Sequence, residues 1–179
     1  LSYYTDEKYA HEIGNIQKTV DSYAKKYDTK IPIAVAGGID TPQKVKHVLN
    51  LGVQAVQVGT RFVTTEECDA DIQYKQAYIK ACKEDIVIVK SPVGMPGRAI
   101  KNTMLESVLR GENIPPRKCY HCLAKCDPGK IPYCITKALI EAAKGNTEEG
   151  LLFCGANAYR AEKIETVKEV IANLMQECV

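Results

Sequence analysis

The sequence predicts an α/β fold with a parallel sheet, because two apolar segments that each end in glycine flank one short helical segment. Residues 31–36 (IPIAVA) run into Gly37-Gly38, and residues 55–58 (AVQV) run into Gly59-Thr60. A nearly continuous apolar run is typical of a parallel strand that is buried on both faces. A strand–helix–strand repeat predicts a parallel sheet that binds ligands at the carboxyl ends of its strands.

The helices around these strands follow from apolar spacing and capping residues. Residues 6–26 place Ile13, Ile16 and Val20 on one face, as an amphipathic helix requires. Between the strands, Thr41 is a favourable N-cap and Pro42 falls at the first helical position. We therefore expect a helix there that ends near Gly52.

The rest of the chain predicts further helices and one more strand. The β-branched run 86–89 (IVIV) is typical of a strand. Two prolines and two glycines in residues 91–98 predict a loop without regular structure. The pattern predicts a helix start at residues 64–67 and helices at about 71–83, 99–110, 132–144 and 161–177.

Glycine at both strand ends suggests an anion site. Backbone N–H groups can approach an anion closely where no side chain intervenes. The last two strands of many (β/α)8 barrels bind a phosphate group in this way. The alternative is that Gly37, Gly38 and Gly59 only make tight turns.

The length and the charge of the chain limit the classes of protein to which it can belong. The chain has 179 residues and a net charge of +2, and its lysines and arginines are scattered. This argues against a nucleic-acid partner. No stretch reaches the ~20 apolar residues of a membrane span, so no membrane partner is expected. Without a signal-peptide pattern we expect a cytoplasmic protein, and Leu1 at the start suggests a missing upstream segment.

Eight cysteines is a high count for this length, and four of them cluster in one segment. Cys119, Cys122, Cys126 and Cys134 are separated by two, three and seven residues. Four thiolates, or three with His121, suit tetrahedral zinc, and four thiolates also suit an iron–sulfur cluster. The alternatives are reduced thiols that pack a lid, or a redox-sensing pair of Cys119 and Cys122.

Several sequence strings together resemble one enzyme family. They are IPIAVAGGI at 31–39, VQVGTRF at 56–62, TEECD at 65–69 and SPVGMPGRAIKN at 91–102. In this order they resemble the carboxyl-terminal half of the nitronate monooxygenases, formerly called 2-nitropropane dioxygenases. The same superfamily contains the flavin-dependent enoyl-acyl-carrier-protein reductases.

The resemblance implies the carboxyl-terminal portion of an FMN-binding (β/α)8 TIM barrel with a Cys-rich helical extension. Residues 1–90 would supply the last βα units, and residues 91–179 would pack on the same barrel. The backbone of five residues would hold the FMN phosphate: Ala36, Gly37, Gly38, Gly59 and Thr60. Arg61 would either add a charge-assisted contact to the phosphate or form a structural ion pair. Gln57 would point into the barrel or into a helix layer.

One departure from the family concerns catalysis. The family's catalytic histidine lies in a Gly-Gly-His stretch of an earlier strand, and this sequence has no such stretch. We expect His11 and His47 to be solvated on helices. Eight strands with their helices need ~250 residues, so we expect a fragment that carries the phosphate half of the site. Residues 155–160 would either turn toward flavin and substrate, with Asn157 and Tyr159 lining the pocket, or make a helix N-terminal turn.

The functional hypothesis is an FMN-dependent oxidoreductase that oxidises alkyl nitronates as small-molecule substrates. One alternative is an enoyl-acyl-carrier-protein reductase, and another is a non-catalytic phosphate- or metal-binding module. The expected partner is the missing N-terminal half of the barrel. A half-barrel exposes sheet edges and apolar surface, so self-association, for instance as a homodimer, is also expected.

Overall fold

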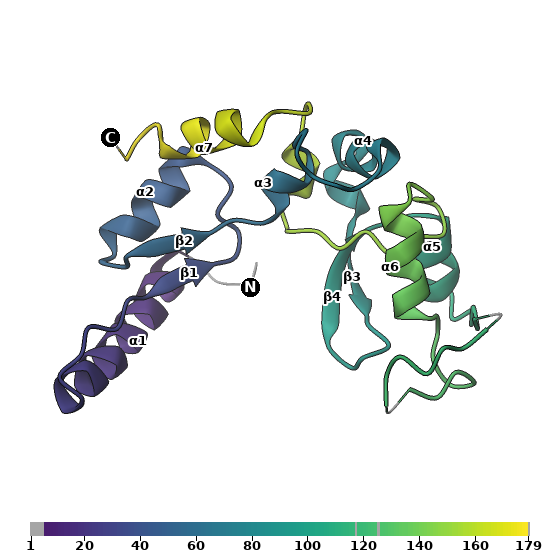
Figure 1. The fold of residues 1–179 in the computed structure, drawn as a ribbon, viewed down its shortest axis with the longest axis horizontal. Coiled ribbons are helices and arrows are strands. Elements are labelled where there is room, and N and C mark those ends of the chain that lie inside the picture. The colour runs from purple at the N-terminus through teal and green to yellow at the C-terminus, as the bar shows by residue number, and fades with distance from the viewer. Residues whose placement is uncertain (1–5, 117, 125, 179) are drawn as a thin grey trace. The chain divides into compact units, whose positions relative to one another are not determined.

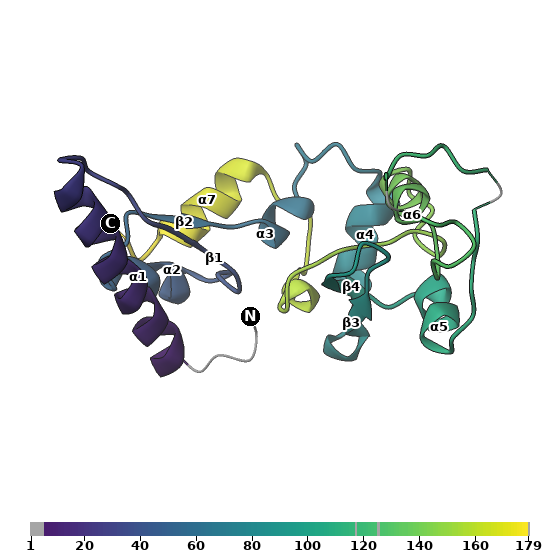
Figure 2. The same ribbon diagram turned by 90° about the horizontal axis from the view of Figure 1, so that it is seen from below.

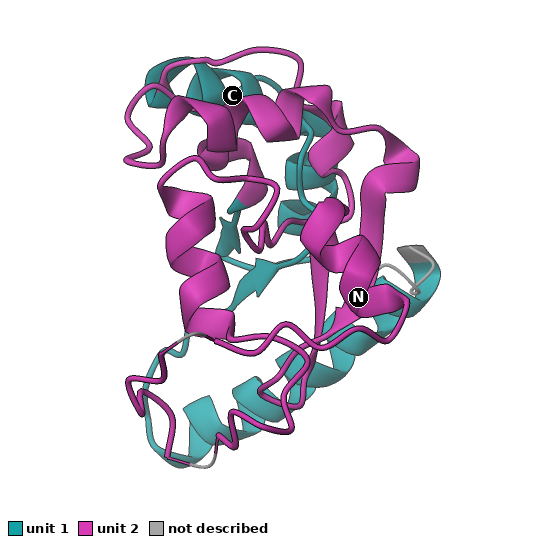
Figure 3. Ribbon diagram, turned by 90° about the vertical axis from the view of Figure 1, so that its right-hand side faces the viewer, with its two compact units in different colours: residues 1–59, 167–179 teal, residues 60–166 magenta. Residues whose placement is uncertain are grey.

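The computed structural model describes residues 6–116, 118–124 and 126–178. The chain divides into two compact units, coloured separately in Figure 3. Unit 1 contains residues 1–59 and 167–179, and unit 2 contains residues 60–166. Within the described residues, no helix is long and apolar enough to cross a membrane. The expected division near residue 90 stays a prediction.

Unit 1 contains the parallel sheet that the two apolar segments predict. Strands β1 (Ala34–Ala36) and β2 (Ala55–Gln57) pair in parallel, with Ala34 opposite Ala55 and Ala36 opposite Gln57. Figures 1 and 2 show the two strands side by side. Helices α1 (Asp6–Lys26), α2 (Pro42–Asn50) and α7 (Val167–Met175) complete this unit.

Local chemistry and apolar packing fix helix α2. The Thr41 hydroxyl accepts a hydrogen bond from the Lys44 N–H, and Pro42 opens the helix as expected. The Gln17 amide of α1 donates to the Leu51 carbonyl at 2.6 Å, just past the end of α2. The apolar core of unit 1 comes from α1, α2, α7 and the connections to the strands: Ile13, Ile39, Val45, Val48, Val53, Val170 and Leu174.

The sheet of unit 1 is much more exposed than a barrel sheet. Ala34, Ala36, Ala55 and Gln57 are exposed, and only the middle residue of each strand is half-buried. Among the described residues, the strands form two separate two-stranded sheets and no closed barrel. The α/β class with a parallel strand pair is therefore confirmed, whereas a closed barrel would need strands beyond those the structure describes.

Unit 2 is built around an antiparallel hairpin that the sequence analysis missed. Strand β3 (Ile86–Lys90) pairs with β4 (Pro96–Ile100) through five residue pairs. The prediction of a loop over residues 91–98 is therefore wrong for residues 96–98. Pro96 is tolerated because it is the first residue of its strand, where a missing N–H costs little. Gly94, at φ = +90°, closes the turn and donates to the Ser91 carbonyl.

Because of the hairpin, the next helix begins later in the sequence than predicted. Helix α5 (Thr103–Leu109) begins four residues later than predicted, because residues 99 and 100 belong to β4. Asn102 caps α5 by accepting from the Leu105 N–H at 2.9 Å. Its amide also donates to the carbonyls of Thr147 and Gly150, so one side chain joins α5 to the segment after α6.

The segment after β2 differs from the predicted helix start at residues 64–67. A four-residue helix, α3 (Thr60–Val63), comes first, and Thr65 then pairs with Glu165 in an isolated parallel bridge. Lys75 of α4 (Ile72–Lys80) is buried and donates to the Thr65 and Glu66 carbonyls. The acidic residues that suggested a helix start thus lie in a turn that a lysine from a later helix holds in place.

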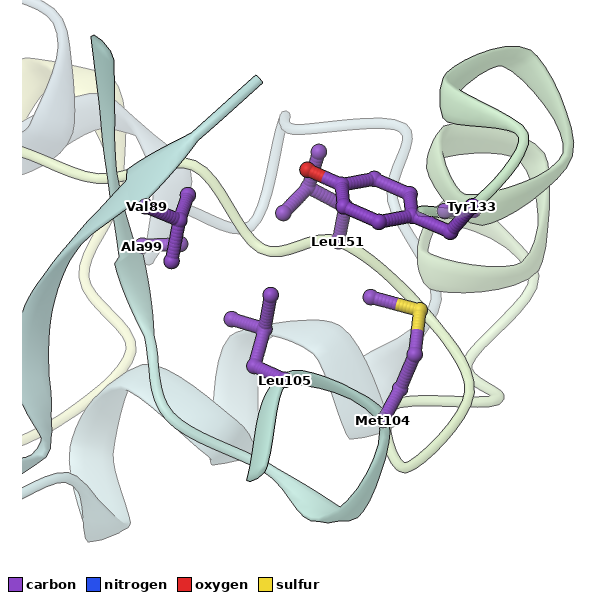
Figure 4. Packing of buried hydrophobic residues seen from close by; sticks show 7 residues of the cluster. Val89, Ala99, Met104, Leu105, Tyr133 and Leu151 are labelled. Carbon is purple, nitrogen blue, oxygen red and sulfur yellow. The ribbon is translucent and has the colours of Figure 1, made fainter. Parts of the chain in front are cut away.

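Two apolar clusters form the core of unit 2. Figure 4 shows the first, where the β3–β4 hairpin faces α5 and the segment that leads into α6 (Ile135–Ala143): Val89, Ala99, Met104, Leu105, Tyr133 and Leu151. The second lies under α4 and contains Tyr78, Ile100, Ala142, Leu152 and Ala158. Phe153 pairs with Ala99 beside the hairpin, and short 3₁₀ helices occur at Lys83–Asp85 (η1) and Ala158–Arg160 (η2).

Candidate functional site

The carboxyl ends of β1 and β2 form the first candidate site. Ala36 is the last residue of β1 and lies opposite Gln57, the last residue of β2. Because the strands run parallel, the chain leaves the sheet at the same edge through Gly37-Gly38 and through Val58-Gly59. Sequence reasoning predicted this juxtaposition from the strand–helix–strand order and the glycines that end both strands.

The backbone at this edge is open to a ligand. Gly37 and Gly38 have φ angles of +106° and +71°, which side-chain-bearing residues rarely adopt. A Cβ placed on Gly38 or on Gly59 would meet no described heavy atom within 4 Å. Space of this kind above two strand-end glycines fits an anion that is held by backbone N–H groups.

A cation at this edge was not found by sequence reasoning. The Lys44 ammonium donates to the Gly38 carbonyl at 2.9 Å and forms an ion pair with Asp40 at 2.8 Å. An ammonium has three N–H donors, and these two contacts use two of them. The signal in the sequence was the position of Lys44 in the first turn of α2, six residues after Gly38.

Thr60, the fifth predicted residue, opens unit 2. Its hydroxyl oxygen accepts a hydrogen bond from the Gly155 N–H at 2.9 Å. A Cβ on Gly155 would lie 2.7 Å from that oxygen, so only glycine allows this approach. The hydroxyl proton of Thr60 is not used in this bond and can be donated to another acceptor. No local pattern indicated that Gly155 would reach Thr60 across 95 residues.

Arg61 adopts the second of its two expected roles. Its guanidinium lies 3.3 Å from a carboxylate oxygen of Glu165, and both side chains are largely buried. Lys163 lies at 4.0 Å from the other oxygen of the same carboxylate. Arg61 is therefore a structural partner of Glu165, which also pairs with Thr65 through the backbone.

The Cys-rich segment of unit 2 forms the second candidate site. A bridge between Ile114 and Tyr133 closes the ends of this segment. A pocket of about 460 Å³ lies between the segment and α6. All four predicted thiols line it: Cys119, Cys122, Cys126 and Cys134. Burial and the neighbouring thiols raise the pKa of the Cys126 thiol.

The four thiols share a pocket but do not converge on one point. Within the described part of the chain, no group of three or more His, Cys, Asp or Glu side chains has a geometry that could hold a metal ion. His121 has a left-handed backbone, and its N–H donates to the Cys119 sulfur at 3.4 Å. Metal binding at these cysteines therefore stays a prediction.

The sequence matches one known family along nearly the whole chain. The profile of the family described as "Nitronate monooxygenase" matches residues 5–177. The chain belongs to the nitronate monooxygenase family. Its similarity to a nitronate monooxygenase of Pseudomonas aeruginosa is 28% identity over 151 residues, which is 82% of this chain and 39% of that protein.

Other members and solved structures agree with the family assignment. A probable nitronate monooxygenase of Staphylococcus haemolyticus is 37% identical over 87 residues, which is 48% of this chain and 24% of that protein. FabK from Thermotoga maritima matches 83% of this chain and 44% of its own, with a TM-score of 0.64 and 26% identity. The nitroalkane oxidase of Streptomyces ansochromogenes shares the fold, with a TM-score of 0.58 and 23% identity over 86% of this chain and 42% of its own. The chain thus spans about a quarter to two fifths of the curated relatives it matches.

The histidines and the segment 155–160, which the sequence analysis also singled out, lie on the helices and turns described above. His11 and His47 are exposed on α1 and α2, as expected. Asn157 precedes the 3₁₀ helix η2, and the Arg160 guanidinium lies over the Tyr159 ring. Residues 155–160 thus form a short helical turn of their own. The last helix, α7, begins only at Val167, six residues later than predicted.

Proposed function

We propose that this chain provides the phosphate-binding part of an FMN-dependent oxidoreductase of the nitronate monooxygenase family. The observation that carries the proposal is the parallel register of β1 and β2. It brings Gly37-Gly38 and Gly59 to the same edge of one sheet. Membership of the family supports flavin as the ligand whose phosphate would lie there.

The residues at this edge fit a phosphate. The backbone of Ala36, Gly37, Gly38 and Gly59 would surround the anion, and a Cβ on Gly38 or Gly59 would meet no atom of the described residues within 4 Å. The Lys44 ammonium lies at the same turn, where a third N–H donor remains for an oxygen of the anion. Backbone dipoles and one cation together suit a group that carries about two negative charges.

Thr60, in unit 2, is the fifth residue that the family resemblance implies for phosphate binding, and its hydroxyl proton remains available for an acceptor. The Gly155 N–H occupies the oxygen as an acceptor and thereby fixes the rotation of the side chain. A fixed donor loses less entropy when a ligand binds than a freely rotating one. Gly155 is therefore a positioning residue for Thr60.

The proposed chemistry is the oxidation of alkyl nitronates. FMN, when bound, supplies the electron transfer, and the protein binds and orients it. The similarity to nitronate monooxygenases of Pseudomonas and Staphylococcus supports this reaction class. The 26% identity to FabK supports enoyl-thioester reduction as the second candidate.

Binding of FMN and riboflavin to the 179-residue chain tests the proposal. The two flavins differ in the phosphate, so flavin fluorescence titrations should give a lower Kd for FMN. Gly59→Ala should abolish this preference, because the new methyl group would occupy the open space without strain in the free protein. Gly14→Ala is the matched control, since its position in α1 is also open and lies far from the strand ends in the sequence.

Equal Kd values for FMN and riboflavin, or no binding of either, would overturn the phosphate site in this chain. A preference for FMN that survives Gly59→Ala would place the phosphate elsewhere. If FMN binds, oxygen uptake with an alkyl nitronate separates the first reaction from NADH or NADPH oxidation with an enoyl thioester. Binding without either activity would favour a non-catalytic phosphate-binding module.

A further inference from the structure

Helix α1 buries only the first part of its apolar stripe. Ile13 is 4% exposed, as a core residue should be. Ile16, Tyr23 and Tyr27, which continue the stripe, are 51%, 52% and 61% exposed. Figure 1 shows the C-terminal part of α1 reaching past the strands of its own unit. Large apolar side chains that are exposed together along one helix are typical of a surface that binds a partner.

The exposed side chains recur with the period of a coiled coil. Tyr9, Ile16 and Tyr23 are spaced by seven residues. Val20 and Tyr27 each follow a member of this line by four residues. Alternating steps of four and three residues keep a stripe on one side of a helix that supercoils around another helix. An open groove of about 730 Å³ borders the stripe at Val20. The spacing therefore favours a second helix as the partner.

The residues beside this stripe change in charge from one end of the helix to the other. Glu12, Thr19 and Lys26 are also spaced by seven residues, and all three are exposed. The line that they form is acidic near the start of α1, uncharged in the middle and basic at the end. A copy of α1 that runs antiparallel would bring Lys26 of the second copy opposite Glu12. Thr19 would then lie on the two-fold axis, so the two ion pairs are equivalent.

We propose that two copies of this chain associate through their α1 helices, packed antiparallel about a two-fold axis. The register that aligns the charges also aligns the apolar side chains, with Ile16 opposite Val20 of the second copy and Tyr9 opposite Tyr27 of the second copy. Antiparallel packing further sets the two helix dipoles in opposite directions. The inference does not depend on flavin binding, because it uses no residue of the glycine turns.

The composition of the stripe is suited to an interface. The rings of Tyr23 and Tyr27 stack with their centroids 6.1 Å apart, so they form one rigid aromatic surface. Tyrosine contributes a large contact area and loses little conformational entropy when it is buried. The Tyr9 hydroxyl is buried and has no hydrogen-bond partner among the described residues, so a partner that arrives at this end can satisfy it.

The expected dimer is weak, because each copy contributes one helix. Helix α1 has 21 residues and is therefore about 32 Å long. Contact along one such helix lies near the lower end of specific interfaces, about 1,200 Å² in total. We therefore expect monomer and dimer to exchange, with a dimer fraction that rises with protein concentration.

Sedimentation velocity of the 179-residue chain over a range of micromolar concentrations tests the proposal. A reducing agent keeps disulfide-linked dimers out of the measurement. Ile16→Lys should leave only monomer, because it places a charge in the middle of the stripe. Ile16 is exposed, so the variant should keep the circular dichroism spectrum and the melting temperature of the monomer. His11→Lys is the matched control, since it adds a lysine at an exposed position of α1 outside the stripe and should leave the dimer unchanged.

Charge exchange tests the antiparallel register. Glu12→Lys places two lysines opposite each other at both ends of the interface, and Lys26→Glu does the same with two carboxylates. Each single change should raise the dissociation constant of the dimer about fivefold at low salt. The double change Glu12→Lys with Lys26→Glu restores opposite charges across the axis and should return the dissociation constant to that of the wild-type chain.

Three results would overturn the proposal. The first is a chain that stays monomeric at every concentration tested. The second is a dimer that survives Ile16→Lys, which would place the interface elsewhere, for instance at the open edges of β1 and β2. The third is a double charge exchange that binds no better than the single ones, because an antiparallel pair of α1 helices requires the restored attraction.

Discussion

The sheets of the two units differ in how their faces are used. In unit 1, β1 and β2 are three residues each, and their outer alanines and Gln57 are exposed. In unit 2, the β3–β4 hairpin buries Val89, Ala99 and Ile100 against two apolar clusters. The parallel pair ends in glycine turns, whereas the antiparallel hairpin organises a core.

The difference suggests a division of roles. A two-stranded sheet is marginally stable unless helices or further strands cover it. Among the described residues, β1 and β2 pair only with each other, so the outer edge of each strand can accept a further strand. Self-association of the chain, or pairing with the other half of a barrel, is the proposal that follows from these open edges.

The largest expected change in the free energy of unfolding comes from a cavity made in the core of unit 2. Leu105 is fully buried, and Leu105→Ala should lower the free energy of unfolding of unit 2 by about 2–5 kcal/mol. Val35 of β1 is only half-buried, and Val35→Ala should cost unit 1 about 1 kcal/mol. Hydrogen exchange in α5 and in α2 measures the two effects separately. Equal costs would show that the sheet of unit 1 is packed as tightly as the core of unit 2.

A pair of glycine substitutions sharpens the same comparison. A Cβ on Gly150 would lie 2.6 Å from the Ala142 backbone, so Gly150→Ala should destabilise unit 2 by about 1–3 kcal/mol. Gly14 lies within α1 with open space around it, so Gly14→Ala should stabilise unit 1 by about 0.5–1 kcal/mol. Urea denaturation followed by circular dichroism measures both, and opposite signs are the expected result. A stabilising Gly150→Ala would contradict the close packing of α6.

A smaller change in stability should appear in unit 2 at high pH. Burial raises the pKa of the Cys154 thiol from 9.0 to about 12, although nearby Arg98 opposes the shift. The folded state therefore binds this proton more tightly than the unfolded state. Its contribution to stability is complete below pH 9.0 and is lost as the pH rises toward about 12. Unfolding midpoints measured across this range should fall.

The variant Cys154→Ala isolates that effect. It should flatten the fall in stability between pH 9.0 and about 12, relative to the wild-type chain. Cys82→Ala is the control, because Cys82 is exposed and its removal should leave the slope unchanged. If the slope is the same in all three proteins, the fall arises from other groups, such as Tyr78, whose pKa burial also raises.

Local patterns were sufficient for the parts of the fold that depend on nearby residues. The spacing of Ile13, Ile16 and Val20 located α1 between the residues that the structure gives. Thr41 and Pro42 located the start of α2, and the glycine turns located the ends of the parallel strands. Capping, helical periodicity and positive φ angles act within a few residues, so they can be read directly from the sequence.

Long-range contacts decided what local patterns missed. Pro96 and Gly97 indicated a loop, but pairing with β3 and the ring of Phe153 made them part of a strand. Thr65 and Glu66 indicated a helix start, but Glu165 and Lys75 hold them in a bridge and a turn. In both cases the energy of pairing with distant residues exceeded the local propensity.

The sequence by itself determined the family and the parallel strand pair, because these depend on residue type at short spacing. The residues of both candidate sites stay predictions of the same kind. Only the tertiary structure decided that Lys44 lies at the glycine turn, that Gly155 fixes Thr60 and that Arg61 pairs with Glu165. It also placed the four thiols around one pocket. These contacts join residues whose separation is set by the path of the whole chain, and no local pattern records that path.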